Sequence, residues 1–353
     1  MKILITGGAG FIGSHLANRL IGANGITVLD DLSTGSADNL AGLTARPGFR
    51  FVHGSVLDSA LVERLVGEND LVVHLAAAVG VRRILLEPIQ SMRTNVQGTE
   101  TVLDACFQHR RKVLIASTSE VYGKNPGHPL CETSDSVFGS SAISRWSYAT
   151  AKKLDEFLAM AYHDVHGLPV IVTRFFNIVG PRQTGRYGMV LPNFIRAALS
   201  GAPLRVFGDG LQTRNFTAVG DCMDAMTALL SEPLAEGQIF NIGGELEISI
   251  WDLAQRVKDL TGSSSPIQLV PYEEAYPEGS FEDMRARVPC ICKIAGLTGW
   301  QPLIALDRII MDTAEHEFLR HSQVLDLSHL SGRLAAEQRL PSPPTDAAEL
   351  ELR

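Results

Sequence analysis

Short apolar segments alternate with longer segments of helical length through the first half of the chain. The short runs KILIT, ITVLD, FRFVHG, LVVHLA, KVLIAS and PVIVTRFF are apolar almost throughout, as expected for strands that are buried on both faces of a parallel sheet. Segments of helical length separate them, at residues 11–23, 59–67, 90–109 and 146–166. This alternation predicts an α/β fold built on a doubly wound parallel sheet.

The alternation loosens after about residue 180, where short strands mix with helices. We therefore predict a Rossmann-type domain over residues 1–180 and a smaller, mixed α/β lobe over residues 181–325, with some of its segments returning to the sheet. The last stretch, residues 326–353, ends in the proline-rich and acidic sequence LPSPPTDAAELELR. Such a composition predicts a disordered tail.

Composition and charge exclude several classes of partner. The chain has 353 residues, of which 45% are hydrophobic and 20% are charged, as in an ordinary soluble globular protein. Its net charge of −8 would repel nucleic acid and anionic membranes, so we expect neither as a partner. No apolar run approaches the roughly 20 residues of a membrane span, and the first residues, MKILITGG, resemble a strand and not a signal peptide. A cytoplasmic location is therefore expected.

The five cysteines do not indicate a metal site. Cys290 and Cys292 are the only two that lie close together in the sequence, and no histidine or second cysteine pair accompanies them. A C-x-C pair of this kind is a poor zinc site. We expect reduced thiols and no bound metal.

Three glycines follow the first predicted strand, in the sequence KILITGGAGFIGSHLANRL. Gly7 would permit a tight turn, Gly10 would let the backbone approach a pyrophosphate, and Gly13 would allow close packing of helix and strand. The N-terminus of the following helix would add amide N–H groups for the phosphates. Asp30, at the end of the second strand, is placed to bind a ribose and would repel a 2′-phosphate. The pattern predicts NAD as the cofactor, in preference to NADP.

Another polar group follows the predicted strand KVLIAS, in the sequence ASTSEVYG. Ser117, Thr118, Ser119 and Glu120 are consecutive. Hydroxyl groups at the end of a strand occur in ordinary turns, where an acidic residue such as Glu120 can cap the turn. They could also form a site that polarises a substrate oxygen. Both interpretations remain open at this point.

Tyr148 and Lys152 lie four residues apart in RWSYATAKKLDEF, so on a helix they share a face. A tyrosine is a poor base unless its ionised form is favoured, and a neighbouring ammonium together with the positive ring of an oxidised nicotinamide would favour it. Such a pair also occurs by chance on surface helices. In a chain that also carries a predicted dinucleotide-binding loop, the pair of Tyr148 and Lys152 indicates a catalytic base.

Together these motifs resemble the extended short-chain dehydrogenase/reductases that act on nucleotide sugars, the NAD-dependent epimerase/dehydratase group. The segments TGGAGFIGSHL, HLAA, ASTSEVYG, SYATAK, RFFNIVGPR and VFGDGLQTRNF run in the family's order from residue 1 to about residue 320. The resemblance implies NAD as the cofactor and a UDP-sugar as the substrate. It also implies a homodimer built on the helices at residues 90–109 and 146–166.

The resemblance implies roles for matching positions. Tyr148 would take the proton of the sugar 4-hydroxyl, Thr118 would hydrogen-bond the 4-oxygen, and Lys152 would hold the nicotinamide ribose and tune Tyr148; Ser119 and Glu120 complete the catalytic set. The matching cofactor-binding positions are Gly7, Gly10, Phe11, Ile12, Gly13, Asp30, Asp31, Ser33, Thr34, Gly35, Ser55, Val56, Leu75, Ala76, Ala77, Asn95, Ser117, Tyr148, Lys152 and Phe175. The matching substrate-binding positions are Thr118, Asn177, Arg186, Asn193, Val206, Phe207, Arg214 and Arg287.

One position departs from the family's pattern. Many relatives carry an aspartate after the third strand, where it meets the adenine, whereas this chain has Ser55 in HGSVLD. Asp58 is an uncertain substitute. Adenine would then be held more weakly, or through backbone groups.

The residues leave the reaction open among several family members. The triplet Thr118-Ser119-Glu120 resembles that of UDP-glucuronate decarboxylases and GDP-mannose 4,6-dehydratases, whereas the TGRYGMV loop with Arg186 resembles that of UDP-glucuronate 4-epimerases. Arg287 fits either reaction on a uronate. We predict a UDP-glucuronate 4-epimerase, which forms UDP-galacturonate through a transient 4-keto sugar.

The first alternative is a UDP-glucuronate decarboxylase of the UDP-xylose synthase type. A UDP-glucose 4-epimerase and an NDP-sugar 4,6-dehydratase follow it. A non-catalytic dinucleotide sensor is disfavoured, because such proteins typically lose the pair that Tyr148 and Lys152 form here.

Overall fold

The computed structural model describes residues 1–80, 86–185, 188–275 and 284–321. The predicted tail, residues 326–353, lies outside the described residues, and so does Arg186.

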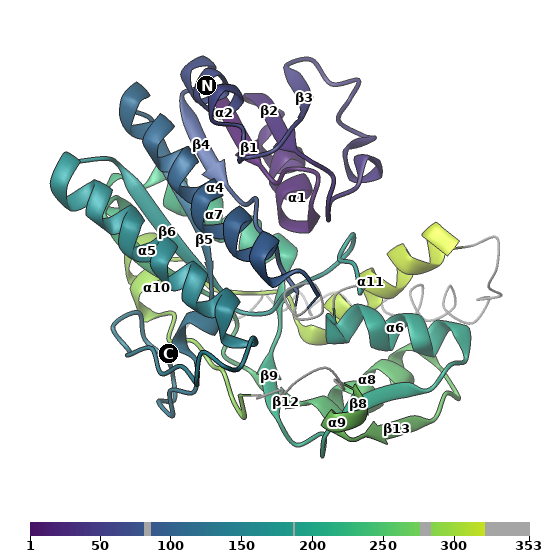
Figure 1. Ribbon diagram of the computed structural model, residues 1–353. Helices are drawn as coiled ribbons and strands as arrows, with labels where there is room; N and C mark the ends of the chain where they lie inside the picture. Colours follow the sequence, from purple (N-terminus) through teal and green to yellow (C-terminus); the bar gives the residue numbers. More distant parts are fainter. Residues whose placement is uncertain (81–85, 186–187, 276–283, 322–353) are drawn as a thin grey trace, which may run out of the picture.

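A seven-stranded parallel sheet forms the centre of the fold (Figure 1). Each neighbouring pair is parallel, in the order β11-β6-β5-β4-β1-β2-β3, so that the strand order reverses direction at β1. The predicted doubly wound sheet is confirmed. Its strands are β1 (Lys2–Thr6), β2 (Gly25–Asp30), β3 (Phe49–His53), β4 (Leu71–His74), β5 (Lys112–Thr118), β6 (Val170–Phe175) and β11 (Gln238–Ile242).

Helices cover both faces of the sheet because the strands are apolar on both sides. One face packs against α2 (Ser59–Glu68), α4 (Pro88–His109) and α5 (Trp146–His166). The other face packs against α1 (Phe11–Leu20) and α7 (Val219–Ser231).

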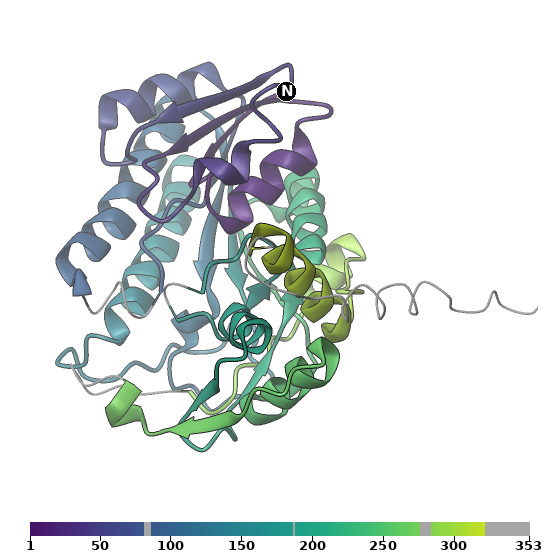
Figure 2. The ribbon, with the colours of Figure 1, turned by 90° about the vertical axis from the view of Figure 1, so that its right-hand side faces the viewer.

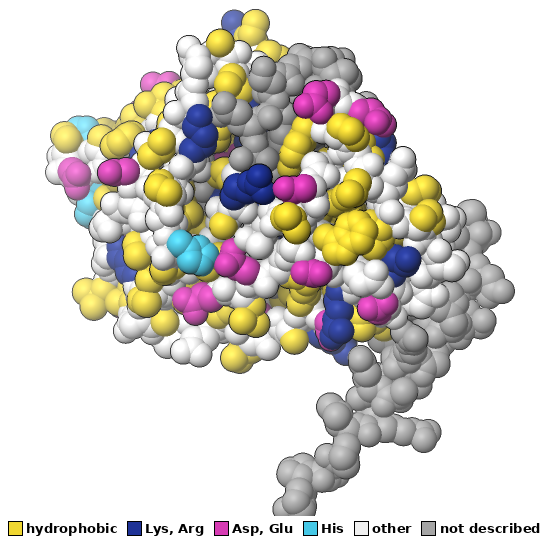
Figure 3. Space-filling model, turned by 90° about the horizontal axis from the view of Figure 1, so that it is seen from below, with side chains coloured by type: hydrophobic (Ala, Val, Ile, Leu, Met, Phe, Trp, Pro, Cys, Tyr) yellow, Lys and Arg dark blue, Asp and Glu magenta, His cyan; other side chains and the backbone are white. Residues whose placement is uncertain are grey.

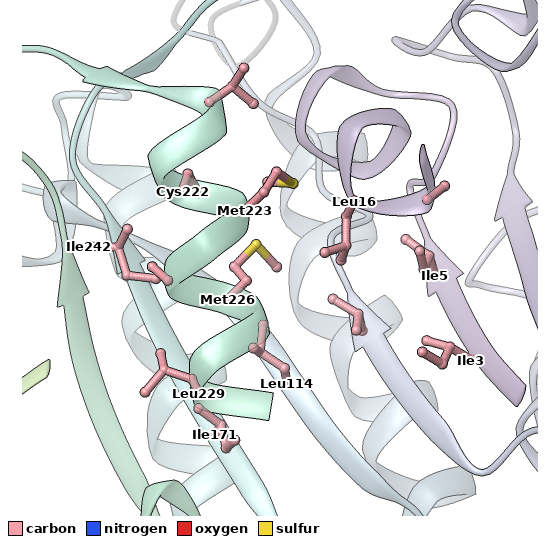
Figure 4. Close-up of a cluster of buried hydrophobic side chains, with 14 of the residues drawn as sticks. Ile3, Ile5, Leu16, Leu114, Ile171, Cys222, Met223, Met226, Leu229 and Ile242 are labelled. Atoms are coloured by element: carbon pink, nitrogen blue, oxygen red, sulfur yellow. The ribbon is translucent and has the colours of Figure 1, made fainter. Parts of the chain in front are cut away.

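The core of this second face is formed by side chains from segments far apart in the sequence. In Figure 4, Met226 and Leu229 of α7 face the strands that carry Leu114 and Ile171, and Leu16 of α1 lies beside them. All five side chains are completely buried. Burying a side chain of this size contributes about 1.5–3 kcal/mol, so the face holds α7 firmly against the first part of the chain.

A smaller group of elements lies at the carboxyl ends of the strands. In Figure 2 its green segments lie below the purple and blue segments of the sheet. The helices α6, α8 and α11 pack around one hydrophobic core, and β8 pairs with β13 beside them. The elements are β7 (Ile178–Val179), α6 (Val190–Ser200), β8 (Leu204–Phe207), β9 (Thr213–Asn215), β10 (Thr217–Ala218), β12 (Glu247–Ser249), α8 (Ile250–Thr261), β13 (Ile267–Val270), α9 (Tyr272–Ala275) and α11 (Leu306–His321).

Some described elements from the second half of the chain belong to the sheet and not to the smaller lobe. Strand β11 pairs with β6 at the edge of the sheet, and α7 and α10 (Cys292–Thr298) pack on the sheet's face. The division of the chain at residue 180 remains a prediction. The described part of the chain also contains the short 3-10 helices η1 (Ala37–Leu40), η2 (Ser119–Tyr122) and η3 (Pro233–Ala235).

Surface properties bear on the expected partners. Figure 3 shows that, on the described part of the lower face, Lys and Arg side chains are interspersed with Asp and Glu. Within the described ranges, every helix is too short or too polar to span a bilayer.

On the adjacent helices α4 and α5, large apolar side chains are exposed: Ile89, Met92, Leu154, Phe157 and Val165. The homodimer that the family resemblance implies remains a prediction.

Candidate active site

A pocket of about 740 Å³ lies where the carboxyl ends of the parallel strands face the smaller lobe. This is the edge at which doubly wound sheets bind their ligands. The predicted site residues that line it are Gly7, Gly10, Phe11, Ile12, Gly13, Asp30, Asp31, Ser33, Thr34, Val56, Leu75, Ala76, Ala77, Ser117, Thr118, Ser119, Glu120, Tyr148, Lys152, Phe175, Asn177, Asn193, Phe207, Arg214 and Arg287.

Four predicted residues lie behind the pocket lining. The side chain of Asn95 is buried and binds both backbone polar groups of Ala78, so it shapes the loop after β4. Gly35 packs against the backbone of Ala9, and Val206 is buried in the core of the smaller lobe. The Ser55 hydroxyl accepts a hydrogen bond from the Leu57 amide and so closes its own turn.

Asp58 has a structural role that its sequence position did not reveal. Its carboxylate accepts a hydrogen bond from the Leu61 amide at 3.0 Å and caps the N-terminus of α2. It does not line the pocket. The adenine contact that was considered for Asp58 therefore has no support in its position.

The glycine loop is packed so closely that side chains do not fit. Gly7 has φ +70°, and a Cβ there would lie 2.7 Å from the Ala76 amide nitrogen. A Cβ on Gly13 would lie 2.6 Å from the Gly8 Cα. Gly10 precedes the first turn of α1 and offers no side-chain cap. The amide groups at this helix end are therefore available to an anion such as a pyrophosphate.

The carboxylate of Asp30 fixes the loops on both sides of it. One oxygen accepts a hydrogen bond from the Ala9 amide at 2.9 Å and the other accepts from the Leu32 amide at 2.8 Å. Burial raises the pKa of Asp30, although both amides act in the opposite direction. Because Asp30 faces the pocket beside the glycine loop, it is positioned to accept hydrogen bonds from a ribose hydroxyl. These features fit the dinucleotide that the sequence predicts.

Tyr148 and Thr118 meet in the pocket although they come from different elements. Thr118 ends β5 and Tyr148 lies in the first turn of α5, and both side chains line the pocket. Burial raises the pKa of Tyr148, and the negative charges of Glu120 and Asp155 raise it further. The ammonium of Lys152 lies 2.8 Å from a carboxylate oxygen of Asp155.

Glu120 does not cap the turn in which it lies. That role belongs to Thr118, whose hydroxyl accepts a hydrogen bond from the Glu120 amide at 3.2 Å. The Glu120 carboxylate instead forms an ion pair with Arg145 and lies 3.8 Å from Arg287. Burial alone would raise the pKa of Glu120, but Arg145 and Arg287 outweigh burial and lower it. Arg287 also donates a hydrogen bond to the Ser119 hydroxyl at 3.2 Å.

Sequence reasoning missed several residues of the pocket. Arg145 is 4% exposed and forms the Glu120 ion pair, and Asp155 holds Lys152. Both lie on or next to the helix of Tyr148 at a spacing of three or four residues from a catalytic position, and this spacing was the signal that could have revealed them. Gln212 and Tyr272 also line the pocket, near Phe207.

Asn177, Asn193 and Arg214, which belong to the predicted substrate-binding set, line the pocket and also contact the protein itself. Asn177 donates hydrogen bonds to Asn215, and Arg214 donates to the carbonyl oxygens of Thr213 and Met284. Both line the pocket, as does Asn193. Arg285, by contrast, is directed to Asp209 and is largely exposed, with 80% of its side chain accessible.

Gly13→Ala should weaken the binding of NAD by about tenfold or more, because overpacking at a closed glycine costs about 1–3 kcal/mol. Isothermal titration calorimetry measures the affinity. Gly22→Ala is the control, since a Cβ at Gly22 meets no atom within 4 Å. An affinity for NAD that is equal in the Gly13→Ala, Gly22→Ala and wild-type proteins would contradict the placement of the cofactor on this loop.

Comparisons with known proteins now identify the family. Residues 3–243 match the NAD dependent epimerase/dehydratase family. The chain is 42% identical to a UDP-N-acetyl-alpha-D-glucosaminuronate decarboxylase of Bacillus cytotoxicus, over 89% of this chain and 97% of that protein. It is 34% identical to UDP-glucuronic acid decarboxylase 1 of Arabidopsis thaliana, over 87% of this chain and 67% of that protein.

Solved structures agree with this assignment. The UDP-glucuronic acid 4-epimerase of Bacillus cereus, in complex with UDP-glucuronic acid and NAD, superposes with a TM-score of 0.81 at 29% identity, over 90% of this chain and 98% of that one. The dTDP-glucose 4,6-dehydratase of Streptomyces venezuelae, with NAD bound, gives a TM-score of 0.83 at 30% identity, over 94% of this chain and 100% of that one. The chain therefore belongs to the NAD-dependent epimerase/dehydratase family of extended short-chain dehydrogenase/reductases, and NAD is its cofactor.

Proposed function

We propose that this protein is an NAD-dependent decarboxylase of UDP-linked uronates. The proposed substrates are UDP-glucuronate and its 2-acetamido counterpart, on which the two relatives described above act by name. The observation that carries the proposal is the cluster of Arg145, Arg287 and Glu120 beside Thr118 and Tyr148, in a chain 42% identical to such a decarboxylase. The comparisons support this alternative better than the 4-epimerase that the sequence favoured.

The charge of this cluster suits a substrate carboxylate. The guanidinium groups of Arg145 and Arg287 both face the carboxylate of Glu120, and all three side chains line the pocket. The guanidinium group of Arg287 suits a carboxylate geometrically. A sugar with an uncharged carbon 6 would not offer Arg287 this partner, so the site would discriminate against UDP-glucose.

Tyr148 and Thr118 would act at carbon 4 of the sugar. Thr118 would hold the 4-oxygen while the phenolate form of Tyr148 accepts the proton of the 4-hydroxyl. When bound, NAD supplies the acceptor for the two electrons that leave carbon 4. Both side chains line the pocket, which supports their acting on the same sugar oxygen.

Loss of carbon dioxide then follows from the chemistry of the sugar. A ketone at carbon 4 is β to the carboxylate, so the electron pair of the breaking carbon–carbon bond can move to the 4-oxygen as an enolate. Arg287 would hold the carboxylate out of the ring plane, the orientation in which that bond breaks. Thr118 and the protonated Tyr148 would stabilise the enolate oxygen, and a proton from water would then add to carbon 5 in place of the carbon dioxide that leaves.

A UDP-glucuronate 4-epimerase is the second candidate. The solved epimerase structure at 29% identity favours it, and an arginine facing the carboxylate serves either reaction. The two reactions differ in what happens to carbon 6, which is retained by an epimerase and released by a decarboxylase.

Product analysis tests the proposed function. The protein is incubated with NAD and, in separate reactions, UDP-glucuronate, its 2-acetamido counterpart and UDP-glucose, and the products are identified by NMR. We expect a UDP-pentose or a UDP-4-keto-pentose from a uronate and no conversion of UDP-glucose. UDP-galacturonate as the product, with carbon 6 retained, would replace the proposal by the epimerase.

Tyr148→Phe should lower the turnover number by about 100-fold or more, because a positioned general base contributes about 10²–10⁴-fold. Binding of NAD should persist, since the glycine loop and Asp30 are unchanged. Turnover is measured by product formation and NAD binding by calorimetry. A variant that turns over as fast as the wild type would show that another group takes the proton.

Arg287→Gln should raise KM for the uronate by about tenfold or more, because a hydrogen bond to a charged group contributes about 1.5–3 kcal/mol. Arg285→Gln is the matched control, since Arg285 is exposed and paired with Asp209. Steady-state kinetics measure KM for the uronate in both variants. Equal KM values in the two variants would exclude Arg287 as the carboxylate-binding group.

A further inference from the structure

Asp155 forms a buried ion pair with Lys152 on α5. The Lys152 Nζ lies 2.8 Å from Asp155 Oδ2, three residues further along the helix. The two residues are only 2% and 1% exposed. The second oxygen of Asp155, Oδ1, is buried and has no hydrogen-bond partner among the described residues. A buried carboxylate costs free energy, so its presence beside the lysine requires an explanation.

Among the described residues, the other titratable groups around this pair are neutral or bound to other partners. His74 of β4 faces Lys152, but burial lowers the pKa of His74 to about 3, and its ring is hydrogen-bonded to Thr6 and Thr99. His74 is therefore neutral at physiological pH. On the other side of Tyr148, Glu120 is matched by Arg145 and Arg287. Asp155 is the carboxylate that compensates the charge of Lys152.

This compensation acts on Tyr148 as well. Burial contributes most to the raised pKa of Tyr148, and the negative charges of Glu120 and Asp155 add to it. A carboxylate near a phenol disfavours the phenolate, so the presence of Asp155 raises the pKa of Tyr148 and its removal would lower that pKa. The same carboxylate fixes the position of the ammonium that faces the pocket.

We propose that Asp155 is a positioning residue that fixes Lys152 and offsets its charge, so that Tyr148 keeps its proton until the positively charged oxidised cofactor is bound. The inference rests on the role proposed for Tyr148 at carbon 4, but not on the choice between decarboxylation and epimerisation. The proposal couples the activation of Tyr148 to occupancy of the cofactor site. Asp155 offsets the positive charge of Lys152, so the positive nicotinamide ring is the group that favours the phenolate once NAD is bound. A base that ionises only in the loaded enzyme would hold its proton whenever NAD is absent.

Ultraviolet titration of Tyr148 tests the proposal without any turnover. Absorbance of the phenolate is followed against pH in the whole protein, with and without NAD, and the signal of Tyr148 is isolated by subtracting the same titration of Tyr148→Phe. In the wild type, NAD should move the midpoint to lower pH. In Asp155→Asn the midpoint should already lie about one pH unit or more lower without NAD, and the further shift on adding NAD should be smaller.

Two further variants keep the result interpretable. Asp164→Asn removes an exposed carboxylate from the same helix and should titrate like the wild type. Asp155→Ser removes the charge while leaving a smaller oxygen acceptor for Lys152, and it replaces Asp155→Asn if that variant does not fold. An Asp155→Asn midpoint equal to that of the wild type would overturn the inference.

Kinetics supply the second readout. The acidic limb of the pH profile of kcat/KM should move to lower pH in Asp155→Asn by the same amount as the absorbance midpoint, whereas a purely structural role would lower the rate at every pH alike. A uniform loss of rate with no change of the profile would therefore contradict the inference. A wild-type protein that shows the expected titration but converts no UDP-uronate would refute the proposed function and leave the role of Asp155 intact.

Discussion

The parallel register of β1, β4 and β5 is the constraint on which the rest of the site depends. Thr6 pairs with His74, and His74 pairs with Ile115, so the loops after these three strands leave the sheet at the same edge. The glycine loop, the Leu75–Ala77 segment and Thr118 consequently line one pocket. The close approach of Gly7 to Ala76 shows how little space separates the first two of these loops.

Buried charges in this region occur in compensated groups. Lys152 is matched by Asp155, Arg174 by Glu156, and Glu120 by Arg145 with Arg287. Burying an unpaired charge costs several kcal/mol, so each of these residues depends on its partner. The group around Glu120 differs from the other two because two guanidinium groups meet one carboxylate in the pocket lining. These guanidinium groups are the feature that suits an anionic sugar.

The fold class could be predicted because its signal is local: short apolar runs alternate with helical segments, and each run became a strand of the sheet. The glycine loop could also be predicted from the spacing of its glycines, and the family assignment followed from the order of the motifs.

The partners of the catalytic residues could not be predicted from the sequence. Glu120 and Arg287 are far apart in the sequence, and only the folded chain brings them together. Asp155 shares a helix with Lys152, but the sequence does not tell which face of that helix is buried. The sequence could not decide between epimerisation and decarboxylation, because Arg287 serves both reactions and the loop that favoured the epimerase contains Arg186, which lies outside the described residues.

The central claim is that one pocket holds the 4-hydroxyl of a uronate at Tyr148 and its carboxylate at Arg287. A crystal structure of the Tyr148→Phe protein with NAD and UDP-glucuronate measures this directly. The account predicts the sugar 4-oxygen within hydrogen-bond distance of Thr118, beside the ring at position 148, and the carboxylate oxygens on the guanidinium group of Arg287. A uronate whose carboxylate points away from Arg287, or a ring at position 148 that faces away from the sugar, would contradict it.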